Sequence, residues 1–340
     1  MNRWTLGLAA IALAGASLLP PLQWQQATPH LNPTIDLVSQ HKLVLGLYAP
    51  RNGGRGGRGG RGAAGVEPAA AAPAPKSPAQ LAQEALAYKN ADFVFDGSME
   101  GDFDRAFPVF ADFMKGMTDA GLVDKTSTPR LHHPVIIKTH KIAPDEKLAT
   151  ERIGRQLDLG VSGIMFPEVE SASEVKAGLA AMRFRSQGGT RRDDVGAAPA
   201  AWGMSEREYK EKADLWPLNP KGELINWTIV ESVEGLKHVR EIAAVKGIGV
   251  LWPGAGTLGG VFSHVDSATG RRVRDDAAWE AAIQQVLAAC KEFNVPCGFP
   301  ANTAEVMEMR AKQGFTVFVS NWGEAGFATV DAGHRLMGKE

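Results

Sequence analysis

The feature that most constrains the fold of this 340-residue chain is a regular alternation of short apolar segments with helical patterns. Two of the segments, residues 135–137 and 317–319, are continuously apolar, as buried parallel strands are. The predicted strands are 43–48, 93–95, 135–138, 163–166, 224–230, 249–252, 297–299 and 316–320. The predicted helices are 35–40, 78–89, 104–117, 145–159, 172–182, 234–245, 277–293 and 303–312. Eight βα alternations favour an α/β fold of the (β/α)8 TIM-barrel type over a doubly wound sheet.

Two stretches are predicted to lie outside this barrel. In residues 1–27, Arg3 precedes an apolar run and Ala14-Gly15-Ala16 offers a cleavage site, which is the pattern of a signal peptide. Export to the periplasm or beyond is therefore expected, with an uncleaved anchor as the alternative and no stable membrane insertion of the rest. Residues 51–78 contain Gly-Gly-Arg repeats and an Ala/Pro tract, which predict a disordered insert after the first strand. The remainder, 28–340, is expected to form one domain.

Charge and cysteine content narrow the classes of partner. The formal net charge of −1 gives no general reason to expect nucleic-acid binding, and RNA contact through the arginines of the insert is a minor alternative. Cys290 and Cys297 could pair in an exported chain, but their spacing does not fix the geometry, and two free, buried thiols are the simpler expectation.

The connection 183–222 is the longest one that reads as folded. Its arginines and glycines would lie near the barrel rim and could hold a carboxylate or phosphate. Alternatively, they form a structured loop through ion pairs with Asp193 and Asp194.

A carboxylate stands where barrel enzymes keep functional groups. Glu231 follows the predicted strand 224–230 and directly precedes a predicted helix. In a (β/α)8 barrel the carboxyl ends of the strands carry the catalytic and metal-binding side chains. The alternative is that Glu231 caps the helix, because helix N-termini favour carboxylates.

Three segments resemble a known family in their order along the chain. Residues 160–171 read GVSGIMFPEVES and resemble the family pattern GA-x-G-(I/L)-(I/L)-x-P-x-V-(E/D)-(S/T). Residues 230–232, VES, resemble its metal-ligand strand, and residues 92–97, DFVFDG, resemble its second strand. From about residue 32 to about residue 327 the chain resembles the HpcH/HpaI aldolase/citrate-lyase family of the phosphoenolpyruvate/pyruvate barrel superfamily.

This resemblance implies a metal-assisted lyase. Family members hold Mg²⁺ or Mn²⁺ with a Glu and an Asp, and the ion stabilises the enolate formed when a carbon–carbon bond breaks. Glu231 matches the metal-binding Glu. The second carboxylate is missing, because residues 252–258 read WPGAGTL. Glu168, at the end of the fourth strand, could substitute for it or could be an ordinary carboxylate of the rim.

The acid–base and anion-binding groups are also only partly retained. Asp96 matches the Asp of the family's His–Asp dyad, but Ser98 and Met99 stand where Glu and His are expected. If one or two residues are inserted, Glu100 could take over as the base of the proton transfer or as an outer metal ligand. Lys138 stands where the family has Arg; it keeps the charge without the bidentate fork, and a Schiff base at this lysine is a further alternative.

The predicted substrate contacts extend this set along the rim. Lys138 and His140 alternate on one face at the end of the third strand and could bind an anionic substrate together. Trp252 and Gly254, at the end of the sixth strand, are expected to line the pocket.

Two functions follow from this set. The first is a lyase that cleaves a 2-oxo or 2-hydroxy acid and releases pyruvate or a related keto acid. The second is a degenerate barrel that binds a small carboxylate in the cell envelope without catalysis. The resemblance also implies a homo-oligomer, a trimer or hexamer that exchanges its C-terminal helices.

Overall fold

The computed structural model describes residues 29–52, 74–124 and 126–338. The predicted signal peptide lies outside the described residues, and so does most of the predicted insert. Within the described part, no helix is both long and apolar enough to cross a membrane.

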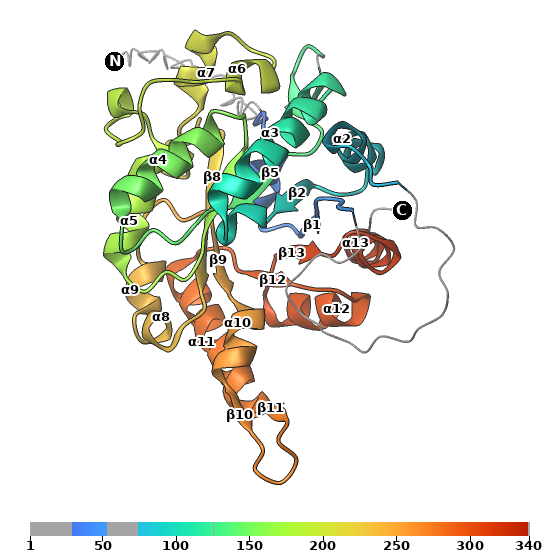
Figure 1. Ribbon diagram of the computed structural model, residues 1–340, viewed down its shortest axis with the longest axis vertical. Coiled ribbons are helices and arrows are strands. Elements are labelled where there is room, and N and C mark those ends of the chain that lie inside the picture. Colours follow the sequence, from blue (N-terminus) through green and yellow to red (C-terminus); the bar gives the residue numbers. More distant parts are fainter. Residues whose placement is uncertain (1–28, 53–73, 125, 339–340) are drawn as a thin grey trace, which may run out of the picture.

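Eight parallel strands form a curled, barrel-like sheet at the centre of the molecule (Figure 1). They pair in the order β12-β13-β1-β2-β5-β6-β8-β9, and a parallel bridge between Leu251 and Cys297 joins β9 to β12. The predicted (β/α)8 barrel-like architecture is thus confirmed in outline, and every predicted strand agrees with an observed one to within one residue at each end. The strands are β1 (Val44–Tyr48), β2 (Phe93–Asp96), β5 (Val135–Lys138), β6 (Gly163–Phe166), β8 (Leu224–Val230), β9 (Val250–Pro253), β12 (Gly298–Pro300) and β13 (Val317–Ser320).

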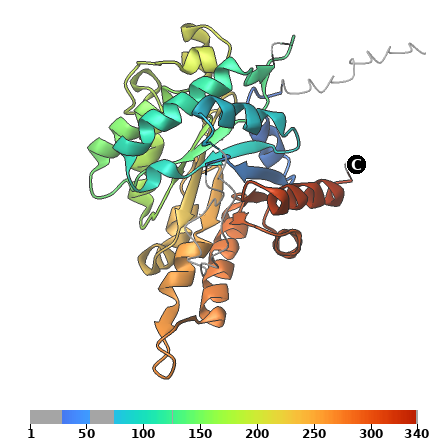
Figure 2. The ribbon, with the colours of Figure 1, turned by 45° about the vertical axis from the view of Figure 1, so that its right-hand side comes forward.

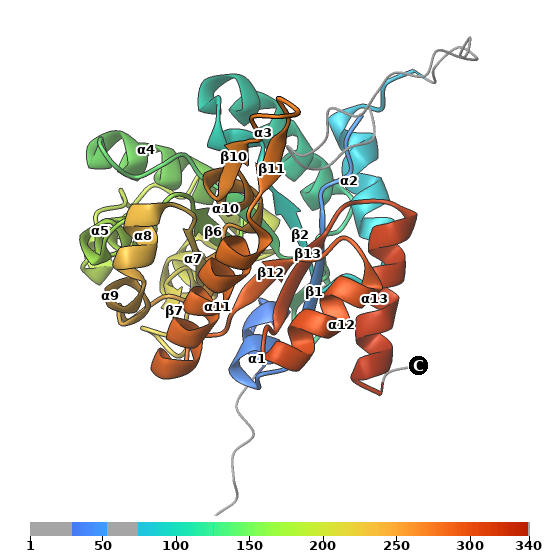
Figure 3. The same cartoon turned by 90° about the horizontal axis from the view of Figure 1, so that it is seen from below.

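Helices surround this sheet (Figure 3). Most begin at a side-chain cap; for example, the Ser77 hydroxyl accepts a hydrogen bond from the Gln80 amide at the start of α2. The main helices are α1 (Pro33–Ser39), α2 (Pro78–Ala87), α3 (Phe103–Asp119), α4 (Glu146–Leu157), α5 (Ala172–Met182), α8 (Val233–Lys237), α9 (Val239–Ala243), α11 (Asp276–Phe293), α12 (Ala304–Gln313) and α13 (Glu324–Leu336). The smaller elements are η1 (Ser98–Glu100), β3 (Val123–Asp124), β4 (Arg130–Leu131), η2 (Arg185–Gln187), α6 (Ala198–Ala201), α7 (Glu206–Lys212) and β7 (Leu215–Trp216).

Aromatic side chains fill the interior of the barrel. The Trp227 ring lies 4.9 Å from that of Phe93 in an edge-on contact and 5.1 Å from that of Trp252. Gly46 makes room for this packing, because a Cβ there would lie 2.2 Å from the Phe93 ring. The inside of the barrel is therefore a packed core, and side chains that could bind a ligand are confined to its ends.

One excursion was not predicted. Between β9 and α11 the chain forms α10 (Ala255–Val261) and a hairpin of β10 (Ser263–Val265) and β11 (Arg272–Arg274). The hairpin projects from the end of the molecule in Figures 1 and 2. The C-terminal helix, α13, packs against α12, β13 and β1 of its own chain. The oligomer implied by the family resemblance stays a prediction.

The long connection 183–222 lies at the opposite end from the expected one. It leads from α5 into β8 and therefore stands at the amino ends of the strands, with α6 and α7 far from α8 and α10 (Figure 1). Its arginines are engaged: Arg183 Nε lies 2.6 Å from Asp214 Oδ1, and the buried Arg191 donates to Asp158 Oδ1 at 2.8 Å. The expectation of a position near the carboxyl-end rim is wrong. A structured loop with Arg–Asp pairs is confirmed, but its main carboxylates are Asp214 and Asp158. Of the two expected partners, Asp194 lies 3.7 Å from Arg192 Nε in an exposed pair, and Asp193 accepts from Ser186.

The two cysteines are paired. Cys290 lies in the last turn of α11 and Cys297 directly precedes β12. Their Cα atoms are 5.7 Å apart, and they form a disulfide. The expectation of two free thiols is wrong, because the loop between the helix and the strand turns back and brings the cysteines together.

Candidate functional site

Four of the predicted side chains meet at the carboxyl ends of β2, β5 and β8. Asp96 and Lys138 are the last residues of β2 and β5, and Glu231 follows β8 directly. Glu100 ends η1, the short 3-10 turn after β2. Parallel strands bring their carboxyl ends to one edge of the sheet, so residues far apart in sequence form one cluster there.

The ammonium group of Lys138 lies between two carboxylates. Its Nζ is 2.7 Å from Glu100 Oε1 and 3.7 Å from Glu231 Oε1. Burial alone would lower the pKa of Lys138, but the charges of Glu231 and Glu100 outweigh it, and the pKa is raised above its ordinary value. Lys138 is therefore a fixed positive charge at neutral pH.

The Glu231 carboxylate is buried and held in place from several sides. Only 3% of the residue is exposed, and Oε1 accepts a hydrogen bond of 3.1 Å from the backbone N–H of Glu168. A Cβ on Gly254 would lie 2.5 Å from Glu231 Oε2, so this position requires glycine. The start of α8 is capped by Ser232, whose hydroxyl accepts from the Gly235 amide at 3.0 Å. The alternative reading of Glu231 as a helix cap is therefore wrong.

Asp96 is also hydrogen-bonded, and its main partner is Arg51, a residue of the predicted disordered insert. Arg51 donates to Asp96 Oδ2 at 2.8 Å, and the Ser98 amide donates to Oδ1 at 2.7 Å. Arg51 follows shortly after β1, which explains why it reaches the rim. The predicted disorder is thus wrong for Arg51 and for Asn52, which exchanges two hydrogen bonds of 2.7 Å with the backbone of Lys76. The proposed proton-transfer role of Asp96 stays a prediction.

The other predicted substrate contacts occupy two different environments. The His140 ring lies at the rim, with Nδ1 2.8 Å from the carbonyl oxygen of Glu100. Trp252 is 3% exposed and packs inside the barrel against Trp227, so its surroundings are those of a core residue. Gly254 lies against Glu231 as described above. The substrate-binding roles of these residues stay predictions.

Besides Arg51, sequence reasoning missed Tyr48 as a contributor to the cluster. Tyr48, the last residue of β1, has a pKa raised by burial and by the nearby charges of Glu100 and Asp96, while Lys138 and Arg51 act in the opposite direction. Lys141 stands outside the cluster, with its Nζ 3.7 Å from Glu168 and 3.4 Å from Glu170. The signal that could have found Tyr48 is its place at a strand end next to Ala-Pro.

The residues present do not fit the divalent metal centre that the family resemblance implies. Among residues 29–52, 74–124 and 126–338, no group of three or more His, Cys, Asp and Glu side chains is placed to hold a metal ion. Glu231 Oε1 already faces the Lys138 ammonium, and Glu168, the candidate second ligand, is directed to Lys141. Hard divalent cations need several oxygen ligands. The expectation of Mg²⁺ or Mn²⁺ at Glu231 stays a prediction that this donor set does not support.

One hollow adjoins the carboxyl ends of the strands, and a second lies on the opposite side of the barrel. A cavity of about 420 Å³ adjoins Asp96, Arg51 and Ser98 and is walled by apolar side chains of α3, including Phe110 and Phe113. It opens beside the charged cluster and could take the apolar part of a ligand.

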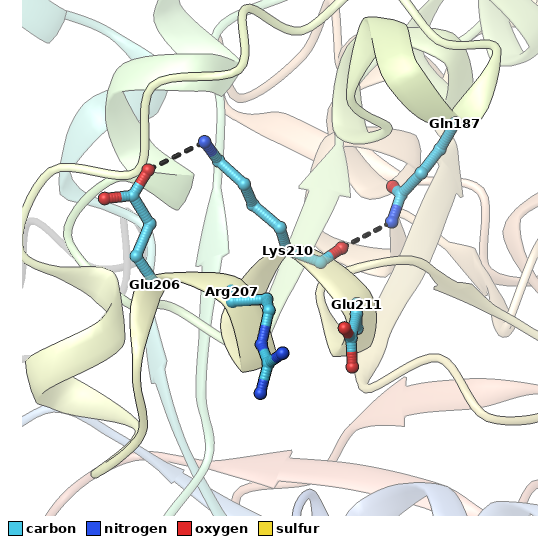
Figure 4. A pocket seen from close by; sticks show the side chains of 5 residues that line it. All are labelled: Gln187, Glu206, Arg207, Lys210 and Glu211. Carbon is cyan, nitrogen blue, oxygen red and sulfur yellow. Dashed lines mark hydrogen bonds and ion pairs between the residues drawn. The ribbon is translucent and has the colours of Figure 1, made fainter.

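The second hollow, of about 600 Å³, lies beside α7 on the amino-terminal side of the barrel (Figure 4). Its polar groups are partly satisfied by one another, since Lys210 pairs with Glu206 at 2.7 Å and its carbonyl accepts from Gln187 at 2.6 Å. It is remote from the cluster at the carboxyl ends of the strands.

Comparison with known proteins agrees with this architecture. A solved HpcH/HpaI aldolase/citrate lyase family protein from Burkholderia cenocepacia covers 90% of this chain and 98% of its own, with a TM-score of 0.60 and 19% identity, which shows the fold alone. A 2-dehydro-3,6-dideoxy-6-sulfogluconate aldolase of Pseudomonas putida is 27% identical over 47% of this chain, and a hydroxypyruvate/pyruvate aldolase of Paraburkholderia phytofirmans is 26% identical over 48%. These alignments span 57% and 58% of the length of the two relatives.

The sequence model of one family matches residues 142–320, which is more than half of the chain. The matched span contains Glu231 and Gly254 and begins just after Lys138 and His140. The chain belongs to the HpcH/HpaI aldolase/citrate lyase family.

Proposed function

We propose that the protein is a carbon–carbon lyase of the aldolase type, which cleaves a 2-oxo or 2-hydroxy acid and releases pyruvate or a related keto acid. The observation that carries this proposal is the Lys138 ammonium, held between Glu100 and Glu231 at the carboxyl ends of the strands in a family of aldolases. Retro-aldol cleavage places negative charge on an oxygen next to the broken bond. A preorganised positive charge in a partly buried site stabilises that charge.

Lys138 can meet a substrate without losing its fixed position. The Glu231 side chain is 3% exposed and that of Glu100 is 34% exposed, so Glu100 is the partner that can turn toward solvent. The ammonium would then exchange one carboxylate for the carboxylate or carbonyl oxygen of the substrate. A Schiff base needs a neutral amine, and the raised pKa of Lys138 disfavours it.

The metal requirement implied by the family is the finer part of this proposal. A divalent ion would serve as a Lewis acid for the same oxygen atoms. Because the described donors do not fit such an ion, we propose that the Lys138 ammonium supplies the positive charge in this chain. The metal dependence implied by the family is therefore tested separately, by comparing cleavage with and without a divalent ion.

The test is pyruvate release from a panel of 2-oxo-acid aldols, with one arm in Mn²⁺ and one in EDTA. We expect cleavage in both arms and its loss in Lys138→Met, with Lys141→Met as a control that removes a neighbouring ion-paired lysine. Cleavage that needs Mn²⁺ refutes the role given to Lys138 as the sole cation. Binding of pyruvate without cleavage of any aldol favours the non-catalytic carboxylate-binding protein instead.

We also propose that the protein works outside the cytoplasm. The apolar N-terminal run predicts export, and the Cys290–Cys297 disulfide supports an oxidising compartment. Fractionation of cells that express the full chain tests this proposal, because a protein found with its leader intact in the cytoplasm would contradict it.

A further inference from the structure

We infer that His140 is the group that moves the proton in this site, with Nε2 as its reactive atom. The inference rests on the proposed lyase function and deepens it. Its basis is a hydrogen bond that fixes the chemistry of the ring. Nδ1 lies 2.8 Å from the carbonyl oxygen of Glu100. A carbonyl oxygen can only accept, so Nδ1 must carry the hydrogen.

This tautomer leaves Nε2 as a base. In the neutral imidazole one nitrogen donates and the other has a free lone pair. Nε2 of His140 has no hydrogen-bond partner among the residues that the structure describes, and the residue is partly exposed at the rim. The Nδ1 hydrogen bond to Glu100 thus orients the ring, and Nε2 is available to a ligand.

The imidazole is tied to the same residue as the cation of the site. The backbone carbonyl of Glu100 accepts a hydrogen bond from the His140 ring. Its side-chain carboxylate accepts one from the Lys138 ammonium. An acid–base group and a positive charge therefore stand on opposite ends of one residue. The other groups of the cluster are less suited to proton transfer, because Asp96 is bonded to Arg51 and Ser98, and Glu231 is buried against Lys138 and Glu168.

The 3-10 turn η1 itself carries no imidazole, whereas His140 lies two residues after β5. Met99 stands at the position in η1 where the family resemblance placed a histidine, and it is fully buried, with its sulfur accepting from Gln156 at 3.5 Å. No titratable side chain projects from that position. His140 brings an imidazole to the turn from the segment that follows β5.

The step balances without any further reactant. For a 4-hydroxy-2-oxo acid, Nε2 removes the proton of the C4 hydroxyl, and the O–H electron pair forms the aldehyde C=O. The C3–C4 bond breaks and its pair forms C2=C3, while the C2=O pair moves to the oxygen that faces Lys138. The protonated imidazole then returns its proton to C3, which yields pyruvate and restores the neutral ring.

The experiment separates proton transfer from cleavage and from folding. Exchange of the pyruvate methyl protons in D₂O, followed by NMR, reports C3 protonation without the aldol substrate. The variants are His140→Ala and His140→Asn, whose amide can still donate to the Glu100 carbonyl but offers no base at Nε2. His264→Gln, on the exposed hairpin, is the matched control.

We expect both His140 variants to lose exchange and cleavage by about 10²–10⁴-fold, while pyruvate binding measured by calorimetry changes by only a few-fold. Added imidazole should restore part of the exchange in His140→Ala, which a purely structural role would not allow. Wild-type exchange rates in His140→Asn refute the inference and leave the lyase intact. A loss in both variants that parallels lost pyruvate binding, without rescue by imidazole, also refutes it. A wild-type protein that neither exchanges pyruvate protons nor cleaves any aldol refutes the lyase and the inference together.

Discussion

Replacing Lys138 by methionine should destabilise the protein far more than an ordinary surface change. The ammonium is 3.7 Å from the oxygen of Glu231, and Coulomb's law with an effective dielectric constant of about 20 gives roughly 4 kcal/mol for two charges at that distance. Relief of the buried lysine's own dehydration offsets part of this. Breaking a buried pair by removing one partner usually costs about 3–5 kcal/mol. We expect the lower end, about 3 kcal/mol, because Glu231 keeps its hydrogen bond from Glu168.

The matched control is Lys141→Met. Lys141 also faces two carboxylates, at 3.7 Å from Glu168 and 3.4 Å from Glu170, but those side chains are 49% and 37% exposed. Exposed pairs contribute about 0–1 kcal/mol. Urea denaturation at pH 7.5 should therefore separate the two variants by at least about 2 kcal/mol.

The pH dependence of the gap tests its electrostatic origin. The pKa of Lys138 is raised in the folded protein, so its contribution is fully present below the ordinary lysine value of about 10.4 and is lost as the pH rises through the folded value. The difference between wild type and Lys138→Met should stay constant from pH 7 to 9 and shrink above that range. A loss of less than 1 kcal/mol, or a gap equal to that of Lys141→Met, refutes the reasoning.

Three further predictions concern other parts of the fold. Burial lowers the pKa of His133 to about 4, so the free energy of unfolding should fall by roughly 3 kcal/mol as the pH drops from above 6.5 toward 4. Urea titrations at several pH values should show this dependence on pH in the wild type and not in His133→Gln. Gly254→Ala should cost about 1–3 kcal/mol because its Cβ meets a buried carboxylate, whereas Gly256→Ala, with nothing within 4 Å, should be neutral or slightly stabilising in thermal melts. Reduction of the Cys290–Cys297 disulfide, which closes a short loop with a separation of 7, should lower the free energy of unfolding by roughly 2 kcal/mol, and the double Cys→Ala variant should not respond to reductant.

Most of the sheet could be predicted because its signals are local. Buried parallel strands such as 135–138 and 163–166 are short apolar runs, and the helices between them start at caps such as Ser171, so pattern and capping give the same boundaries. The hairpin β10–β11 gave no such signal, since its exposed strands carry arginines and have no buried face. The composition of the connection 183–222 suggested the carboxyl ends of the strands. Its position between α5 and β8 places it at the amino ends instead.

The candidate site could be predicted only as a set of residues. Position at a strand end indicated Glu231, because that rule depends on sequence order alone. The family resemblance added Asp96 and Lys138. Which charges pair was not predictable, since the distances that join Lys138 to Glu100 and Glu231 are set by side chains from three different strand ends. The role of Arg51 was hidden for a related reason, because a Gly-Arg composition predicts disorder even where the first residue of the segment reaches a buried carboxylate.

Stability alone does not account for the charges at this rim. A buried ion pair can often be replaced by packed apolar side chains at no cost, or with a gain of about 1–4 kcal/mol. The chain instead places a lysine against two carboxylates, with a histidine on the backbone of one of them. The property that this arrangement provides and an apolar one lacks is a positive charge and a free basic nitrogen in fixed positions at the carboxyl ends of the strands, which the proposed cleavage of a keto acid requires.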